Sequence, residues 1–97
     1  MAVLERVHLP VKPGDEEAFE RAMSETGLDV LRAAPGCQGV ELRRGVETPG
    51  TYLLLVHWDE VASHTAFTQQ PEFGGLVEVL KAHLGGPTDM EHFGDPV

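Results

Sequence analysis

The chain has 97 residues, of which 41% are hydrophobic and 24% charged, as in one soluble globular domain covering residues 1–97. Its 16 acidic residues outnumber the 7 basic ones, and the resulting formal charge of −9 would repel phosphate backbones, so no nucleic acid is expected as a partner. No apolar run approaches the ~20 residues of a membrane helix, no apolar signal segment opens the chain, and Cys37 is the single cysteine. We therefore expect no membrane association, no intramolecular disulfide and a cytoplasmic location.

The first predicted element is a strand over residues 3–11, in which Glu5 shares one face with apolar side chains, namely Val3, Val7, Leu9 and Val11. A turn at residues 12–14 leads to a long helix over residues 15–34, with Asp15 at its N-cap. One helix face is expected to be buried and carries Phe19, Ala22, Met23, Thr26, Val30 and Leu31. Gly27 is expected to weaken the middle of this helix, and Pro35 with Gly36 to end it.

Strands are next predicted over residues 37–44 and 51–58, joined by a hairpin connection over residues 45–50. The later strand is apolar on both sides. One face carries Tyr52, Leu54, Val56 and Trp58, and the other carries Thr51, Leu53, Leu55 and His57. Because neither face suits water, we expect helices to cover the first and a second copy of the chain to cover the other, which predicts a homodimer.

Asp59 is expected to cap a short helix that ends near Phe67, and a second helix is expected to begin near Pro71. This second helix has an amphipathic pattern formed by Phe73, Leu76, Val77, Leu80 and Leu84. A last strand over residues 88–93 carries Met90 and His92 on one face. The order βαββαβ, with the second helix split, predicts an α+β ferredoxin-like sandwich with a four-stranded antiparallel sheet and helices on one face.

The sequence resembles the antibiotic biosynthesis monooxygenase (ABM) domain family of the dimeric α/β-barrel superfamily. The matching segments are VKPGDEEAFE, APGCQGVEL, WDEVASHTAF followed by PEF, and the closing EHF. The resemblance implies a dimer with a small pocket between sheet and helices in each subunit. It further implies oxidation of aromatic or quinol-type compounds by O₂ without flavin or bound metal, so no cofactor is expected.

Two departures from relatives narrow this expectation. Haem-degrading relatives have an Asn in the first strand and a His about ten residues after the Trp, whereas this chain has Arg6-Val7-His8 and Thr68 at those places. Some quinol-oxidising relatives carry two histidines where this chain has Phe67 and Glu72. Haem degradation is therefore disfavoured, and quinol oxidation lacks its usual residues.

His64 is the candidate catalytic base. On a helix beginning at Asp59 it would form one stripe with Val61 and Phe67, and Glu60, one turn earlier, could hold its ring. An imidazole there could take a proton from a phenol or enol, which raises the electron density that O₂ attacks. The alternative is a packed histidine with one satisfied hydrogen bond.

The candidate substrate-binding residues are Trp58, Tyr52, Phe67 and His92. Trp58 and Tyr52 could stack on a flat ligand, and the alternative for them is core packing. His92 could close the pocket, and the alternative for it is a histidine at the edge of the sheet. No metal-binding motif is present.

The predicted function is a cofactor-independent monooxygenase acting with O₂ on a small aromatic, quinol or polyketide-like substrate. The alternative is a non-catalytic dimer that binds a small apolar ligand or acts in a stress response.

Overall fold

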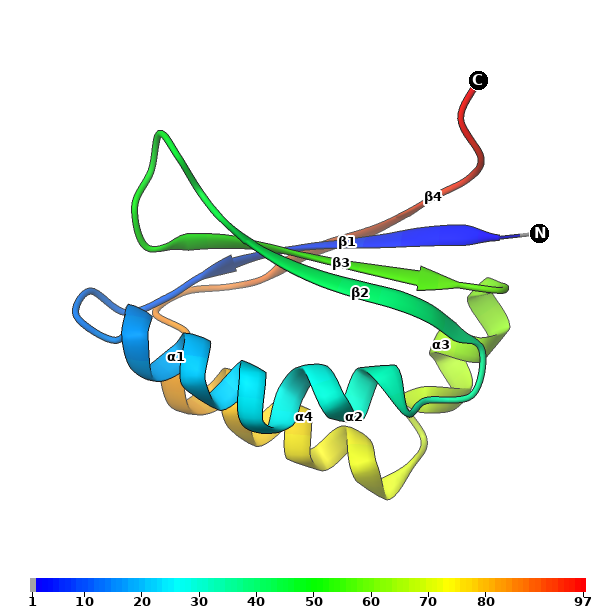
Figure 1. Ribbon diagram of the computed structural model, residues 1–97, viewed down its shortest axis with the longest axis horizontal. Coiled ribbons are helices and arrows are strands. Elements are labelled where there is room, and N and C mark those ends of the chain that lie inside the picture. Colours follow the sequence, from blue (N-terminus) through cyan, green and yellow to red (C-terminus); the bar gives the residue numbers. More distant parts are fainter. Residues whose placement is uncertain (1) are drawn as a thin grey trace.

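The computed structural model describes residues 2–97 as one four-stranded sheet with all helices on one of its faces (Figure 1). The elements are β1 (Val3–Pro10), α1 (Glu16–Ala22), η1 (Met23–Gly27), α2 (Leu28–Arg32), β2 (Cys37–Arg44), β3 (Thr51–Trp58), α3 (Val61–Phe67), α4 (Pro71–His83) and β4 (Asp89–Phe93). This is the predicted βαββαβ order, with the second helix split into α3 and α4. The ferredoxin-like fold is confirmed.

The strand order is β2-β3-β1-β4, and all three pairings are antiparallel. The register places Glu5 of β1 opposite Val56 on one side and opposite His92 on the other. Since directly paired residues point to the same face, Glu5 and His92 both lie on the face that carries the helices. The two ends of β3 are far apart, because Tyr52 and Trp58 are six residue steps apart along the strand, or about 20 Å.

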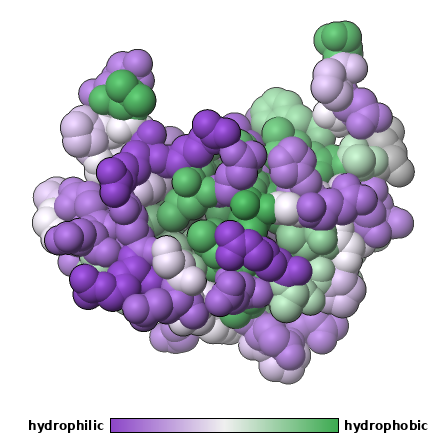
Figure 2. All heavy atoms as spheres, viewed as in Figure 1, coloured by the Kyte–Doolittle hydropathy of each residue, from purple (hydrophilic) through white to green (hydrophobic). Residues whose placement is uncertain are grey.

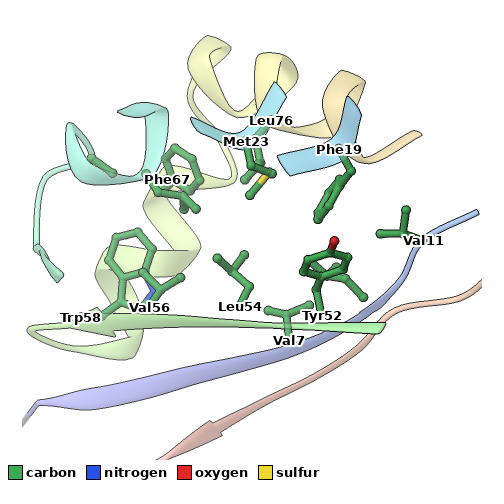
Figure 3. Close-up of a cluster of buried hydrophobic side chains, with 13 residues drawn as sticks. Val7, Val11, Phe19, Met23, Tyr52, Leu54, Val56, Trp58, Phe67 and Leu76 are labelled. Carbon is green, nitrogen blue, oxygen red and sulfur yellow. The ribbon is translucent and has the colours of Figure 1, made fainter. Parts of the chain in front are cut away.

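The core lies between the sheet and the helices. The predicted inward face of β3 is buried throughout, with Tyr52 and Leu54 3% exposed and Val56 and Trp58 fully buried. Figure 3 shows Trp58 and Tyr52 at opposite ends of this strand, with Phe67 above the first and Phe19 above the second. Space between sheet and helices is therefore filled by side chains over the centre of β3.

The first helix differs from the continuous helix expected over residues 15–34. A five-residue π-helical segment, η1, interrupts it, and the extra residue per turn shifts the buried stripe. Thr26, expected inside, is exposed, and Gly27 is buried in its place. A Cβ built on Gly27 would lie 2.6 Å from the sulfur of Met23, so the missing side chain makes room for that buried methionine.

The start of the short helix also differs. Asp59 was expected as its N-cap, but α3 begins at Val61 and its N-cap is Glu60, which has extended backbone angles. The carboxylate of Asp59 accepts a hydrogen bond from the hydroxyl of Ser63. Val61 is 43% exposed, so the expected stripe reduces to His64 and Phe67. The last strand begins one residue later than predicted, at Asp89.

The second face of the sheet carries no helix (Figure 1). Its central side chains, Leu4, Leu53 and Leu55, are only half-buried, and Phe93 is 43% exposed. The guanidinium of Arg6 lies 6.0 Å from the Phe93 ring centroid. An apolar strip therefore runs across an otherwise charged surface.

Gly36 makes the turn before β2 and should tolerate no side chain. Its φ is +90°, and an added Cβ would lie 2.4 Å from the Ser63 hydroxyl oxygen. Gly36→Ala should lower the free energy of unfolding by about 1–3 kcal/mol. Gly74→Ala is the control, because it lies in helix α4 with no atom near its Cβ and should gain about 0.5–1 kcal/mol. Urea denaturation measures both, and equal effects would contradict this account of the turn.

Candidate functional site

Among the described residues, Glu5 is the one charged residue that is buried, at 6% exposure. The indole N–H of Trp58 donates a hydrogen bond of 2.9 Å to its carboxylate. Burying a carboxylate is costly unless donors or cations compensate it, so these two residues depend on each other. The strand alternation placed Glu5 on the apolar face of β1 but indicated no role for it. A lone acid at an inward position was the signal that could have revealed it.

His64 lies between Glu5 and His92. Its Nε2 is 3.5 Å from the Glu5 carboxylate oxygen, and its Nδ1 is 2.7 Å from Nε2 of His92. The imidazole also stacks on Trp58, with ring centroids 5.3 Å apart and planes 18° apart. Strands β1, β3 and β4 and helix α3 thus each contribute one side chain to a compact cluster: Glu5, Trp58, His92 and His64.

Burial lowers the pKa of His64 below its ordinary value of 6.5. The negative charge of Glu5 acts in the opposite direction, and His92 adds a smaller lowering effect. The imidazole is therefore neutral at pH 7, with one protonated nitrogen, and it can accept a second proton. This is the state that a general base requires.

Glu60 does not hold the His64 ring, contrary to the expectation from sequence. The i, i+4 argument assumed that Glu60 lies within the helix, but its extended backbone (φ −160°, ψ 161°) places it before the first turn. Glu60 is exposed, and the carboxylate near His64 comes from the sheet instead. The prediction failed because one residue of helix start changes which side chains share a face.

Tyr52 lies at the opposite end of β3 from this cluster. Its hydroxyl donates to the carboxylate of Glu20 at 2.5 Å, and Arg44 forms two hydrogen bonds of 2.6 Å with the same carboxylate. The Arg44 bonds, and next the Tyr52 bond, lower the pKa of Glu20, whereas burial and the Glu20 carboxylate raise the pKa of Tyr52 to about 12. Tyr52 is therefore a protonated donor at neutral pH.

These three residues border a cleft of about 460 Å³ between β2 and the helices. Figure 2 shows hydrophobic surface there, with hydrophilic residues around it. A ligand that touches Tyr52 would be remote from His64. Tyr52 as a residue of the same substrate site stays a prediction.

Phe67 is 3% exposed and packs between the cluster and another cleft. Its ring centroid is 5.9 Å from that of Trp58. The cleft has a volume of about 540 Å³ and lies between α2 and the junction of α3 and α4, where Val30, Ala34 and Pro35 give it an apolar lining. A third hollow of about 190 Å³ borders Leu4 and His57 on the open face. Neither His64 nor His92 lines any of these three clefts.

The other histidines lie elsewhere. His57 is exposed on the open face, 3.9 Å from the Glu41 carboxylate, and His83 bonds to Asp15 at 2.9 Å. No group of three or more His, Cys, Asp or Glu side chains within residues 2–97 is placed to hold a metal ion. Nor does any helix in that range combine the length and apolarity needed to cross a membrane.

The fold and the cluster define a small α+β sandwich that carries a half-buried histidine pair on the helix-bearing face at one end of its sheet. The family model of antibiotic biosynthesis monooxygenases matches residues 2–79. This chain belongs to that family, as its sequence motifs implied. No curated protein sequence matches it significantly.

Solved structures agree with the family. A Bordetella bronchiseptica protein with the same family description superposes with a TM-score of 0.91 at 28% identity, covering 99% of this chain and 98% of its own. One from Nitrosomonas europaea gives 0.86 at 15% identity, with coverages of 97% and 89%. A mutant of SnoaB from Streptomyces nogalater, a cofactor-independent oxygenase, gives 0.83 at 19% identity, with coverages of 97% and 92%. The last two similarities show the fold alone.

Stability should depend on pH through His64. Its lowered pKa means that the folded protein binds this proton more weakly than the unfolded chain does, so unfolding takes up protons. The stabilisation is present above pH ~6.5 and is lost as pH falls through the lower pKa of the folded state. His64→Gln, which cannot be charged, should lose less unfolding free energy than the wild type between pH 7.5 and pH 5. Urea denaturation followed by circular dichroism measures this, and an equal loss in both proteins would refute it.

Proposed function

We propose that this protein is a cofactor-independent monooxygenase that oxidises a small aromatic, quinol or polyketide-like substrate with O₂. The observation that carries the proposal is the half-buried pair of His64 and His92 beside the buried Glu5 carboxylate. Family membership and the similarity to a cofactor-independent oxygenase support the same class of reaction. The residues supply what such a reaction needs from a protein, namely a neutral base that can receive a proton.

In this reaction the histidine pair removes the proton of a phenol or enol. The resulting anion is a stronger electron donor, and O₂ attacks its electron-rich carbon. Oxidation of a ring CH₂ to a carbonyl consumes one O₂ and releases one water, so the substrate itself supplies all the electrons. The buried Glu5 carboxylate stabilises the imidazolium that forms at His64.

The substrate is proposed to approach from the edge strand β4 on the helix-bearing side of the sheet. His92 is half-buried, and Met90, on the same face of that strand, is 46% exposed. A flat apolar ring can therefore reach Met90 while its hydroxyl meets the histidines. Trp58 stacks against His64 behind the pair and supports it from within. Direct contact of Trp58 or Phe67 with substrate stays a prediction.

His64→Ala should lower oxygen uptake by at least about 100-fold with a dihydroxyanthracene or a hydroquinone as substrate, because proton removal is lost. The control is Thr65→Ala, an exposed residue that follows His64 on the same helix. An oxygen electrode measures both variants against the wild type. An unchanged rate in His64→Ala would remove this histidine from the mechanism.

We also propose that two copies associate through the open face of the sheet, with Leu4, Leu53 and Leu55 at the centre of the interface. A dimer would bury side chains that the single chain leaves half-covered. It would also protect the one sheet face that lacks helices.

The wild type should therefore sediment at twice the 10.5 kDa mass of the chain. Leu53→Glu should shift the population to monomers, since a carboxylate would be buried without a partner. Arg21→Glu, on the exposed side of α1, is the control and should remain dimeric. Analytical ultracentrifugation at micromolar concentration decides, and a monomeric wild type would defeat the proposal.

A second candidate function is a non-catalytic dimer that binds a small apolar ligand. The cleft beside Phe67 favours it, because about 540 Å³ is a common size for small-molecule sites and its lining is largely apolar. Tight binding of an apolar dye that Val30→Trp abolishes, together with no oxygen uptake on any aromatic substrate, would favour this function over the oxygenase.

A further inference from the structure

Both ring nitrogens of His64 are already engaged. Nε2 faces the Glu5 carboxylate at 3.5 Å, and Nδ1 is hydrogen-bonded to Nε2 of His92 at 2.7 Å. A substrate therefore cannot bond to this imidazole without displacing one of its neighbours. His92, in contrast, has a second ring nitrogen, Nδ1, for which the structure records no partner within residues 2–97.

Glu5 selects which nitrogen of His64 carries the proton. A carboxylate oxygen beside Nε2 favours an N–H there over a lone pair, because two lone pairs would repel each other. The 3.5 Å separation is long for a hydrogen bond, but in a buried setting the charge still acts strongly at this range. Trp58 fixes that carboxylate by donating its indole N–H at 2.9 Å.

The rest of the proton pattern follows. With Nε2 of His64 protonated, its Nδ1 has a lone pair and accepts the N–H of His92 Nε2. Neutral His92 then has its own lone pair on Nδ1. His92 is half-buried on the edge strand β4, and no partner is recorded for its Nδ1 within residues 2–97, whereas the lone pair of His64 Nδ1 is already engaged by His92.

We infer that Glu5 is a positioning residue that fixes the tautomer of His64, so that Nδ1 of His92 is the atom that receives the substrate proton. This rests on the proposed function. The substrate O–H gives its proton to His92 Nδ1, and the proton of His92 Nε2 passes to His64 Nδ1. The step ends with a substrate anion, a neutral His92 and a His64 imidazolium paired with Glu5. The negative charge is then on the substrate and the positive charge on His64, and every proton is accounted for.

The ionisable groups that act on His64 are Glu5 from β1 and His92 from β4. Glu5 raises the pKa of His64 by its charge, so neutralising Glu5 lowers the pKa of His64. A lower pKa makes a weaker base that stays unprotonated to lower pH. A purely structural role for Glu5 would lower activity without moving the pH profile.

The test compares Glu5→Gln, which keeps the shape and an acceptor for Trp58, with Glu91→Gln. Glu91 is the matched control, since it precedes His92 on β4 but is exposed. Nitrogen-15 spectra of the imidazoles at pH 7.5 should show N–H at Nε2 of both His64 and His92 in the wild type and in Glu91→Gln. In Glu5→Gln the His64 proton should move toward Nδ1. A wild-type His64 protonated at Nδ1, or a pattern unchanged by Glu5→Gln, would overturn the inference.

Kinetics form the second arm, with a dihydroxyanthracene or a hydroquinone as substrate. Glu5→Gln should lower kcat by at least about tenfold with little change in KM, and should move the acidic limb of the pH profile to lower pH. A limb that stays in place overturns the relay. If the wild type oxidises neither substrate, the oxygenase function fails, and the nitrogen-15 pattern alone decides whether Glu5 sets the tautomer. If Glu5→Gln does not fold, the wild-type nitrogen-15 spectrum decides, since N–H at Nε2 of His64 supports the inference and N–H at its Nδ1 overturns it.

Discussion

A carboxylate removed from water must be surrounded by donors or positive charge, and in this protein Glu5 imposes that requirement on one end of the sheet. The Trp58 indole meets it directly, at 2.9 Å. The His64 imidazole places its Nε2 3.5 Å from the same carboxylate and stacks on the same indole. The contacts of His64 with Glu5 and Trp58 therefore determine the position and orientation of helix α3 over the end of β3. The histidine pair follows from this placement.

The two ends of β3 illustrate how one strand can support two separate environments. At the Trp58 end, the polar groups are enclosed by the sheet, α3 and β4. At the Tyr52 end, a phenol, a carboxylate and a guanidinium meet at the border of an open cleft. The apolar side chains between them, Leu54 and Val56, keep the two polar groups apart (Figure 3).

The strands could be predicted closely because period-two alternation and flanking Pro or Gly residues act locally. β2 and β3 begin and end where the pattern indicated. The helices were predicted less well, since their faces depend on counting turns. One π-helical segment at Gly27 moved Thr26 outward, and one residue of delay in α3 removed Glu60 from the face of His64. Such shifts depend on packing between distant elements, which a single segment does not contain.

For the candidate site, the sequence pointed to His64, Trp58 and His92, and the structure brings these three together. It also pointed to Tyr52, which shares a face with Trp58 but lies about 20 Å away along the strand. The alternation of side chains along a strand shows which face of the sheet a residue is on. It does not show how far that residue lies from another residue on the same face. Glu5 was missed for a related reason, because its neighbours come from β3, α3 and β4 and only the sheet register joins them.

Trp58 is the single tryptophan of the chain, and its indole ring lies against the imidazole of His64. An imidazolium accepts an electron from excited indole far more readily than neutral imidazole does. Protonation of this histidine should therefore quench the fluorescence of Trp58. The tryptophan fluorescence intensity of the unlabelled protein should therefore report whether His64 is protonated. Because the chain has no other tryptophan, this signal comes from Trp58 alone.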